Sequence, residues 1–459
     1  MGFIRRGFWK LLFLLPYSRR LYTRLISTPL EKKNPSKDQT EIHDFLTFAI
    51  SSVPYYRENY FTQNKKEIHL TKLPILKKRI VKTQSNNLLA DNYQKRQNKL
   101  ILTLNKSPLH NLWNIFFQKD FLIPMTTGGT SGTPITCYKN KESLYAEALL
   151  FIRGWKMMGY NPGDKVLVFY NRYYDYDLSW ANSLTFLHGI HLFFFDSLNE
   201  KVIQELAKKI NTFKPDFIIT FPSYISYAAE VIKKKKIKIN HTIKGIEVSG
   251  ETIFPYHRKN CEEIFQTKLY NSYGSIEIGN TIAHECSQHT GMHVFEDIVH
   301  MEEKRNKLVI TRFNAWEMPF IRYEIGDKGK LRHERCPCGI EGLKLVELQG
   351  RIEDYIILPS EKRIYPSSLR QIINQCNALY PDSIKESKVI QNTITGIIVY
   401  LVADAQAKKK DINTFLINRL RKFFPEEFKI TIRFIPKLPF TKKFRFIERR
   451  FKTPNHSAP

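Results

Sequence analysis

The stretch Thr126-Thr-Gly-Gly-Thr-Ser-Gly-Thr-Pro134 is the part of the sequence best suited to bind an anion. Its glycines let backbone N–H groups curl around a phosphate, and its threonine and serine hydroxyls add short hydrogen bonds to phosphate oxygens. The stretch lacks the Gly-Lys-Ser/Thr ending of a Walker A loop and the G-x-G-x-x-G spacing of a dinucleotide fold. We therefore predict a phosphate-binding loop, with a flexible surface loop as the alternative.

Cysteine and histidine residues form a second group that can do chemistry. Cys286-Ser-Gln-His-Thr-Gly-Met-His293 precedes Cys336-Pro-Cys338, and four nitrogen and sulfur ligands from two such pairs suit a closed tetrahedral Zn²⁺ site. His293, His289 and His284 are alternative histidine ligands, and reduced free thiols are the alternative to a metal. All six cysteines are expected to be thiols or metal ligands in a cytoplasmic chain.

Composition limits the class of protein that carries these groups. The length of 459 residues predicts two to four structural units. Because 42% of the residues are hydrophobic and 13% aromatic, the chain can bury a large core, which excludes a disordered chain. With 72 Lys+Arg against 44 Asp+Glu, its formal net charge is +28. No nucleic-acid-binding motif accompanies this charge, so we favour a lysine-rich surface over specific nucleic-acid binding.

The amino-terminal segment 1–17 combines basic and apolar residues, as a signal peptide does. However, Lys10 interrupts its apolar run, Pro16 ends it, and no small-residue cleavage site follows. The run is also shorter than the ~18–20 apolar residues that span a bilayer. We expect a cytoplasmic protein, and two interpretations of this segment remain open: peripheral contact with anionic lipid, and a first helix packed on its own domain.

The order of predicted elements indicates how these groups are positioned. Residues 41–160 predict mostly helices and loops, whereas strands and helices alternate after residue 161, which is typical of an α/β sheet with crossovers. Short strands are expected over 292–333, and we place a domain boundary between 1–350 and 351–459. The expected strands are 165–170, 190–195, 216–221, 243–249, 387–403 and 428–435, and the expected helices are 200–212, 223–236, 366–378 and 409–423.

The phosphate-loop stretch resembles that of the adenylate-forming (acyl-CoA synthetase-like) superfamily. The chain is most similar to its phenylacetate–CoA ligase branch, which includes homologues associated with capsular polysaccharide biosynthesis. The resemblance extends from about residue 120 to the C-terminus, because further motifs follow in the family's order. It implies a large adenylate-forming domain, with mixed α/β sheets and a β-rich subdomain, followed by a small, mobile α+β domain.

The resemblance also assigns roles to the residues expected to bind ATP. Val248-Ser-Gly-Glu251 is similar to the segment whose backbone lines the adenine pocket, and Tyr270-Asn-Ser-Tyr-Gly-Ser-Ile-Glu277 is similar to the motif that stacks on adenine and binds Mg²⁺. Tyr273 would supply the ring and Glu277 the carboxylate; the alternatives are a core aromatic and a solvated helix N-terminus. The implied nucleotide-binding residues are Thr126, Thr127, Gly128, Gly129, Thr130, Ser131, Gly132, Thr133, Gly250, Glu251, Tyr273, Gly274, Ser275, Asp327 and Arg351, with Thr127 also placed among the catalytic groups.

Three further motifs complete the resemblance. Asp327, in Arg322-Tyr-Glu-Ile-Gly-Asp327, would accept hydrogen bonds from the ribose hydroxyls. Arg351 would reach the nucleotide from the hinge signature, in which Glu353 replaces the usual Asp or Lys. Lys443 matches the lysine that stabilises the adenylation transition state, although its loop is shortened and lacks the family's glycine; a basic C-terminal tail is the alternative.

The resemblance implies a two-step reaction. A small carboxylate would be activated with ATP and Mg²⁺ to an acyl-adenylate and passed to CoA, with the aromatics Phe169, Tyr170, Tyr173, Tyr174, Tyr176 and Trp180 either shaping the acyl pocket or packing in the core. The alternatives are transfer to an amine in surface polysaccharide synthesis and a catalytically impaired scaffold. Some members of the branch carry a structural zinc set that matches Cys286, His293, Cys336 and Cys338. Neither the carboxylate nor the oligomeric state follows from the sequence.

Overall fold

The chain forms two compact units in a computed structural model. The first comprises Met1–Ile253, His257–Ile325 and Gly329–Leu348, and the second comprises Phe254–Tyr256, Gly326–Lys328 and Gln349–Pro459. The structure describes residues 39–60, 68–97, 120–126, 135–161, 163–171, 189–195, 198–251, 253, 255–351, 355–360, 363–364, 369, 372–373, 376–377, 379–380, 383–421, 423–438 and 446–451.

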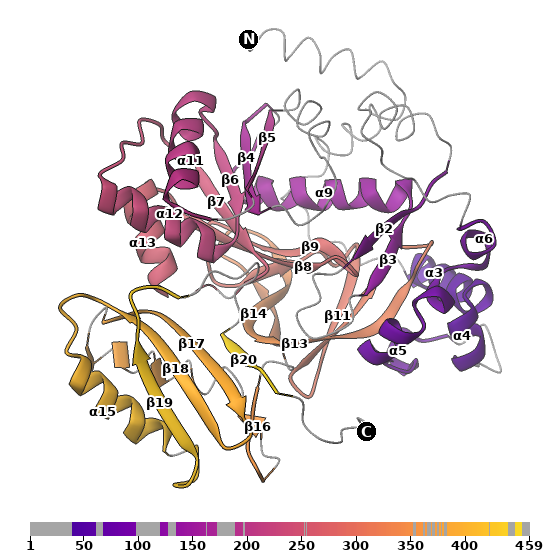
Figure 1. Ribbon diagram of the computed structural model, residues 1–459. Coiled ribbons are helices and arrows are strands. Elements are labelled where there is room, and N and C mark those ends of the chain that lie inside the picture. Colours follow the sequence, from indigo (N-terminus) through magenta and orange to yellow (C-terminus); the bar gives the residue numbers. More distant parts are fainter. Residues whose placement is uncertain are drawn as a thin grey trace. The chain divides into compact units, whose positions relative to one another are not determined.

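A 12-stranded sheet forms the centre of the first unit (Figure 1). Its parallel part runs β5 (Ile190–Phe195), β4 (Val166–Asn171), β6 (Phe217–Thr220), β7 (Gly245–Ser249) and β8 (Leu269–Ser275). The helices α11 (Glu200–Phe213), α12 (Pro222–Lys235) and α13 (Pro255–Phe265) lie beside these strands. The predicted α/β sheet with crossovers is confirmed.

Local sequence explains why these helices begin and end where they do. The Asn199 side chain accepts a hydrogen bond from the Val202 backbone N–H and caps the start of α11. That helix ends at Lys214, which adopts a left-handed conformation, and it buries Ile203, Leu206, Ala207 and Ile210. The apolar spacing of this helix is what made it predictable.

The sheet becomes antiparallel beyond β8. It continues through β9 (Gly279–Glu285), β10 (Met292–Val294), β14 (Glu341–Arg351), β13 (Phe320–Arg335), β12 (Lys307–Arg312) and β11 (Val299–Lys304). The expected β-rich region is therefore present, but β13 is one long strand rather than several short ones. The large core cluster packs here, around Phe295, Ile310, Phe313 and Tyr323.

The amino-terminal part of the first unit is joined to this region. Helices α3 (Gln39–Ser52), α4 (Pro54–Asn59), α5 (Lys78–Thr83) and α6 (Asp91–Gln94) precede the sheet, and the two-residue strand β1 (Leu76–Lys77) pairs in parallel with β13 at Tyr323 and Glu324. Arg322, with φ of 48°, donates to Glu302 and to the Thr71 carbonyl, which holds this segment against β13. The sequence had predicted helices and loops here but not β1.

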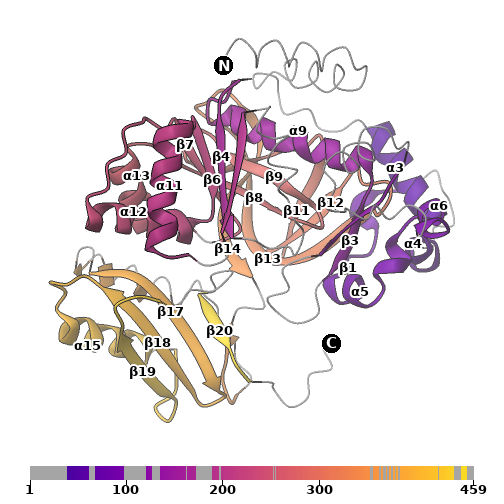
Figure 2. The same cartoon turned by 45° about the horizontal axis from the view of Figure 1, so that its top comes forward.

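Helix α9 (Lys141–Met157) runs along β9, as Figures 1 and 2 show. The contact is close: a Cβ added to Gly154 would lie 2.6 Å from a ring carbon of His284 on β9. A residue without a side chain is therefore required at this crossing. The helix follows the hairpin of β2 (Ile123–Thr126) and β3 (Thr136–Lys139).

The second unit has its own sheet, in the order β19 (Lys429–Phe434), β18 (Gly396–Ala403), β17 (Ile384–Thr393), β20 (Ile447–Arg449). Helix α15 (Lys409–Leu420) buries Ile412, Leu416 and Leu420 in the core of this unit, and a two-stranded ribbon, β15 (Ile356–Ile357) with β16 (Arg363–Ile364), belongs to it as well. The expected strand over 387–403 is two strands joined by a turn, and β20 was not predicted.

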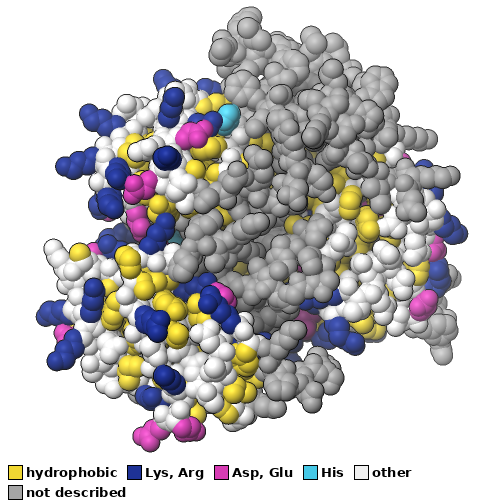
Figure 3. Space-filling view, viewed as in Figure 1, with side chains coloured by type: hydrophobic (Ala, Val, Ile, Leu, Met, Phe, Trp, Pro, Cys, Tyr) yellow, Lys and Arg dark blue, Asp and Glu magenta, His cyan; other side chains and the backbone are white. Residues whose placement is uncertain are grey.

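On the face that Figure 3 shows, the described residues carry positive charge in dispersed form. Figure 3 shows Lys and Arg side chains scattered among uncharged and hydrophobic ones. In the lysine run that ends α12, Lys233 pairs with Glu263 and Lys235 with Glu200. Within the part of the chain that the structure describes, no helix has the length and apolar character needed to cross a bilayer. The segment 1–17 lies outside the described residues.

Candidate nucleotide site and metal centre

The predicted phosphate loop is closed by a hairpin. Thr126, the last residue of β2, pairs with Thr136, the first of β3, and Ile123 pairs with Lys139 at the other end. The two ends of the loop are therefore held a strand spacing apart, about 5 Å. Thr127, Gly128, Gly129, Thr130, Ser131, Gly132 and Thr133 lie outside the described residues.

Glu277 lies at the tip of a tight turn between β8 and β9. Ser275 pairs with Gly279 across this turn, and Gly279 adopts a positive φ of 101°. A Cβ on Gly274 would lie 2.3 Å from the Asn280 carbonyl oxygen, so the backbone approaches too closely for any other residue. Residue Glu277 is 7% exposed, and none of the described residues hydrogen-bonds to its carboxylate. A buried carboxylate without partners is suited to bind a cation.

The phosphate-loop hairpin lies beside this carboxylate. Burial first, and the negative charge of Glu277 second, raise the pKa of the Cys137 thiol on β3 well above its usual value. Lys139 of β3 and Asn280, which follows the Glu277 turn, hydrogen-bond to the same carboxylate, that of Glu147, so this turn lies near the hairpin that closes the predicted phosphate loop. That this carboxylate faces the loop stays a prediction, because residues 127–134 lie outside the described residues. The donor set, one carboxylate plus the phosphates that a loop of this kind would hold, fits Mg²⁺.

A buried group of charged side chains, which we call the ion triad, hydrogen-bonds to the residue that follows the Glu277 turn. The triad consists of Lys139 on β3, Glu147 on α9 and Arg312 on β12, each at most 4% exposed. Glu147 accepts hydrogen bonds from Lys139, from Arg312 at 2.7 Å and from the Asn280 amide at 2.9 Å. Asn280 follows the Glu277 turn directly, so the triad fixes the backbone that presents the carboxylate.

Sequence reasoning missed the ion triad. Its members are far apart in the chain, and each taken alone reads as a surface charge. Glu147 is four residues before Phe151 on α9, within the apolar stretch that packs on the sheet, and that placement is the signal that could have singled it out.

The residues expected around adenine have mixed surroundings. Tyr273 on β8 is 5% exposed and belongs to the large core cluster. This burial is what we expect of a core aromatic, the alternative to a ring that stacks on adenine. Gly250 follows β7 with φ of 72°, and a Cβ there would lie 2.9 Å from the Phe221 ring. The Glu251 carboxylate accepts hydrogen bonds from the backbone and hydroxyl of Ser223 and thereby caps α12. Its backbone, not its carboxylate, is therefore the part available to line a pocket.

The remaining nucleotide residues belong to the second unit or to its connection. Asp327 lies in β13, directly after Gly326, which has φ of 95°. Arg351 is the last residue of β14, and only its backbone is described. Glu353 and Lys443 lie outside the described residues, but the loop that carries Lys443 is bounded by β19 and β20, and Val389 donates to the Phe446 carbonyl at its downstream end. These assignments stay predictions.

The aromatic residues expected near an acyl group divide into two sets. Phe169 is fully buried against Phe193, Phe195 and Tyr224, so it belongs to the core. Tyr170 is partly buried and contacts the Phe221 ring edge-on at a centroid distance of 4.7 Å. Tyr173, Tyr174, Tyr176 and Trp180 lie outside the described residues.

The structure brings together the four predicted zinc ligands. The ligand atoms of Cys286, His293, Cys336 and Cys338 all lie within 4.8 Å of one another. The Cys286 and Cys336 sulfurs are 3.7 Å apart, and Cys338 Sγ lies 3.5 Å from His293 Nε2. With Zn–S of about 2.3 Å and Zn–N of about 2.0–2.1 Å, a tetrahedral site places two sulfurs about 3.8 Å apart and a sulfur and a nitrogen about 3.5 Å apart. The observed separations fit this geometry, and they exclude a Cys286–Cys336 disulfide of about 2.05 Å.

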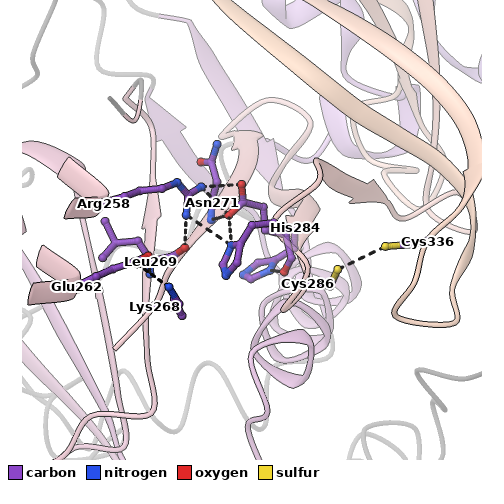
Figure 4. Close-up of polar contacts among 10 residues, drawn as sticks. Arg258, Glu262, Lys268, Leu269, Asn271, His284, Cys286 and Cys336 are labelled. Carbon is purple, nitrogen blue, oxygen red and sulfur yellow. Dashed lines mark hydrogen bonds and ion pairs between the residues drawn. The ribbon is translucent and has the colours of Figure 1, made fainter. Parts of the chain in front are cut away.

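The other two candidate histidines have different partners. His284 Nδ1 lies 2.6 Å from the Glu285 carbonyl oxygen, and His289 Nδ1 lies 3.1 Å from the Glu285 carboxylate, which also accepts two hydrogen bonds from Arg258. In Figure 4 this group of polar contacts lies on the other side of Cys286 from Cys336. Burial, with Lys344 as the second cause, lowers the pKa of His293 to about 4, which keeps its imidazole neutral as metal binding requires.

The cluster ties together two turns. Cys286 directly follows β9, His293 is in β10, and Cys336-Pro-Cys338 occupies the turn between β13 and β14, where Cys336 N–H donates to the Ile340 carbonyl. Glu277 precedes β9 and Cys286 follows it, so the strand separates them by about 20 Å. A metal at the cluster would therefore stabilise the sheet and take no part in chemistry at Glu277.

Comparisons with known proteins agree with this architecture. The family model "AMP-binding enzyme" matches residues 62–301, just over half of the chain, and "CapK C-terminal domain" matches residues 356–450. Protein CapK of Staphylococcus aureus is 25% identical over 348 residues, covering 71% of this chain and 73% of that protein. Phenylacetate-coenzyme A ligase of Thermus thermophilus is 27% identical over 273 residues, covering 54% of this chain and 58% of that protein.

Solved structures match the fold across most of the chain. A 2-hydroxyisobutyryl-CoA ligase in its postadenylation state, in complex with 2-HIB-AMP, superposes with a TM-score of 0.65 at 18% identity, covering 92% of this chain and 93% of that one. An open conformation of the same enzyme, with 2-HIB-AMP and CoA, has a TM-score of 0.56. These matches confirm the predicted fold class. With its phosphate-loop hairpin, its Glu277 turn and the family match over its sheet, the chain belongs to the AMP-binding enzyme family.

Proposed function

We propose that the protein activates a carboxylic acid with ATP to an acyl-adenylate, with release of pyrophosphate, and then transfers the acyl group to CoA. The observation that carries this proposal is the buried Glu277 carboxylate, unpartnered among the described residues and close to the base of the phosphate-loop hairpin. Mg²⁺, when bound, would neutralise charge on the phosphates. Membership of the AMP-binding enzyme family, and the names of two relatives that are CoA ligases, support the same reaction.

The chain's own residues have defined tasks in this proposal. The turn from Ser275 to Gly279 holds the Glu277 carboxylate, and the ion triad fixes that turn through Asn280. Loop N–H groups and hydroxyls from Thr126 to Thr133 would hold the phosphates, Tyr273 and Gly250 would flank adenine, and Asp327 and Arg351 would reach the ribose and nucleotide. Lys443 would stabilise charge on the transferring phosphoryl group.

A second candidate is transfer of the acyl group to an amine acceptor in surface polysaccharide synthesis. The specific observation that favours it is the match of residues 356–450 to the CapK C-terminal domain, together with the similarity to protein CapK. Because both candidates share the adenylation step, they predict the same behaviour of Glu277 and differ only in the acceptor.

A pyrophosphate-release assay distinguishes these candidates. Purified protein is incubated with ATP, Mg²⁺ and a panel of aryl, fatty, hydroxy and amino acids, with and without CoA or amino sugars. Release that depends on one class of acid supports adenylation, and the acceptor that increases turnover decides between thioester and amide. Silence across the panel, with no detectable ATP binding, contradicts both and favours a scaffold. Glu277→Gln should lower release by about 10²–10³-fold, whereas Glu263→Gln on the surface of α13 should leave it unchanged.

We also propose that Cys286, His293, Cys336 and Cys338 hold a structural Zn²⁺. The separations of their ligand atoms and the burial of three of the four support this assignment. Zinc, when bound, would link the turn after β9 to the turn between β13 and β14. Metal analysis of protein purified under reducing conditions tests it, and one equivalent of zinc per chain is expected; protein free of metal after growth in zinc-replete medium contradicts it.

A further inference from the structure

Lys344 is a buried lysine next to the proposed metal ligands. It lies on β14 directly opposite His293 of β10, and its side chain is 1% exposed. Its ammonium group donates to Thr290 Oγ1 at 2.7 Å, pairs with Glu334 at 3.0 Å and lies 3.8 Å from Cys336 Sγ. Burying an ammonium is costly unless negative charge accompanies it, so its surroundings must supply that charge.

Charge counting indicates where the negative charge comes from. Three thiolates, one neutral imidazole and one Zn²⁺ carry a net charge of −1, which a single ammonium neutralises. Glu334 also pairs with Lys344 at 3.0 Å, but its side chain is 36% exposed and partly solvated, so the ammonium can compensate the buried sulfur as well. The Cys336 sulfur, by contrast, is buried, and it receives the only ammonium within hydrogen-bonding distance among the described residues.

Thr290 extends the same arrangement. Its hydroxyl lies 2.7 Å from Lys344 Nζ and 3.8 Å from Cys336 Sγ, so the ammonium, the hydroxyl and the sulfur form one closed set of contacts. Thr290 is between Cys286 and His293 in the chain, and Lys344 faces His293 across the sheet. Partners of this kind orient metal ligands, and their loss typically weakens metal binding by about 10–100-fold.

We propose that Lys344 is a positioning residue of the metal centre: its ammonium holds the Cys336 thiolate and neutralises the excess negative charge of a Cys₃His zinc site. This inference rests on the proposed zinc site. It goes beyond the four ligands because it makes zinc affinity depend on a lysine that does not bind the metal.

The second unit supplies a matched control. Lys388 on β17 is also buried, with a side chain 3% exposed, and pairs at 2.7 Å with Glu448, whose side chain is 26% exposed. It thus resembles Lys344 in burial and in its carboxylate partner, but none of the described cysteine sulfurs lies within hydrogen-bonding distance of it. Lys388→Met removes a buried ammonium without touching the metal ligands.

The test is the zinc affinity of the full-length protein, measured by competition with a chromophoric chelator. Lys344→Met should bind zinc about 10–100-fold more weakly than wild type, Lys344→Arg should recover part of the loss because the charge is kept, and Lys388→Met should match wild type. Equal zinc affinity of wild type and Lys344→Met overturns the Lys344 inference and leaves the zinc site intact. Wild-type protein that binds no zinc overturns the metal site and this inference together.

If Lys344→Met does not fold, a second variant and a spectroscopic measurement test the same inference. Lys344→Gln keeps a hydrogen-bond donor without the charge, on a side chain one bond shorter, and Lys344→Arg keeps the charge, so the two variants together separate the roles of the ammonium. In the Co²⁺-loaded protein, the sulfur-to-metal charge-transfer band should shift in Lys344→Gln relative to wild type, because the thiolate loses its charged partner. A band identical to wild type in both Lys344→Gln and Lys344→Arg contradicts the inference.

Discussion

The two ends of β9 differ in how their candidate ligands for a cation are arranged. Before the strand, Glu277 is buried without a hydrogen-bond partner among the described residues. After it, the ligand atoms of Cys286, His293, Cys336 and Cys338 already lie at the separations of a tetrahedral site. The first arrangement suits a cation that arrives with a substrate and leaves with a product, and the second suits a metal that stays. In our proposals, this one strand joins a site where a cation exchanges with substrate to a site where a metal stabilises the fold.

The largest expected effect concerns the support beneath the Glu277 end. Glu147→Gln should lower the free energy of unfolding by about 3–5 kcal/mol, because Lys139 and Arg312 would be left buried without their counter-ion. Denaturant unfolding measures this loss. Glu347→Gln, which removes an exposed pair with Lys330, should cost at most about 1 kcal/mol.

The same variant has a defined pH dependence. Burial acts to raise the pKa of Glu147, but Lys139 and Arg312 outweigh it and the pKa is lowered. A depressed folded pKa contributes stability that is present above the unfolded value of 4.5 and is lost as pH falls through the folded value. The difference between wild type and Glu147→Gln should therefore shrink below pH 4.5; a difference that is constant with pH contradicts the ionised triad.

Removal of the metal should produce the next largest effect, at the opposite end of the strand. For a metal present at about 1,000 times its Kd, stripping it with a chelator should lower the free energy of unfolding by about 4 kcal/mol. Thermal unfolding before and after chelation, and after zinc is restored, measures this. Cys261→Ser, which changes a buried thiol outside the cluster, should respond to the chelator as wild type does. If the unfolding temperature does not respond to chelation, the cluster after β9 holds no stabilising metal and the proposed contrast between the two ends of β9 fails.

Glu277→Gln should leave stability unchanged and remove activity. We expect pyrophosphate release to fall by about 10²–10³-fold, which corresponds to about 2.7–4 kcal/mol, because the carboxylate proposed to bind Mg²⁺ is lost and the metal would no longer neutralise charge on the phosphates. Since none of the described residues bonds to this carboxylate, the unfolding midpoint should stay within experimental error of wild type. A variant that unfolds more easily but retains turnover would assign Glu277 to structure.

The smallest expected effect is the pH-dependent stability due to Glu317, a buried glutamate whose pKa shifts in the opposite direction from that of Glu147. Burial raises the pKa of Glu317, the opposite of Glu147. With a raised folded pKa, the native state holds a proton that the unfolded chain loses above pH 4.5, so the stability due to Glu317 falls as pH rises. Glu317→Gln cannot ionise and should be more stable than wild type at pH 7, by on the order of 1 kcal/mol, with the advantage disappearing below pH 4.5. Unfolding at pH 4, 5.5 and 7 measures it, and a variant that is less stable at every pH contradicts it.

Local patterns explain what could be predicted from the sequence. The strand 190–195 was predicted because a run of apolar residues is bounded by turn signals, and α11 because its buried residues recur at helical spacing. Cys286, His293, Cys336 and Cys338, which the structure brings together, were also singled out, because cysteine and histidine pairs are rare and carry their own signal. These features can be recognised within one short window of sequence.

Contacts between distant segments account for what was missed. Strand β1 has only two residues, and its parallel partner on β13 is supplied by Tyr323 and Glu324. Lys139, Glu147 and Arg312 come from three elements, and Lys344 reaches Cys336 only because β14 folds back on β13. Their burial is a property of the assembled sheet, and charged residues taken one by one are expected at the surface.

The packing of the amino-terminal helices against β13 has a consequence for folding during synthesis on the ribosome. Tyr56 donates to the Pro319 carbonyl, 263 residues later, and Lys77 pairs with Glu324, 247 residues later. At about 5–20 residues per second, a ribosome needs roughly 13–53 s to synthesise the intervening chain. During that interval the apolar residues Phe45, Leu46 and Tyr56 have no β13 to cover them. Exposed apolar surface of this kind makes incomplete chains prone to aggregate, so a truncation before residue 324 should leave the first helices without their partner on β13.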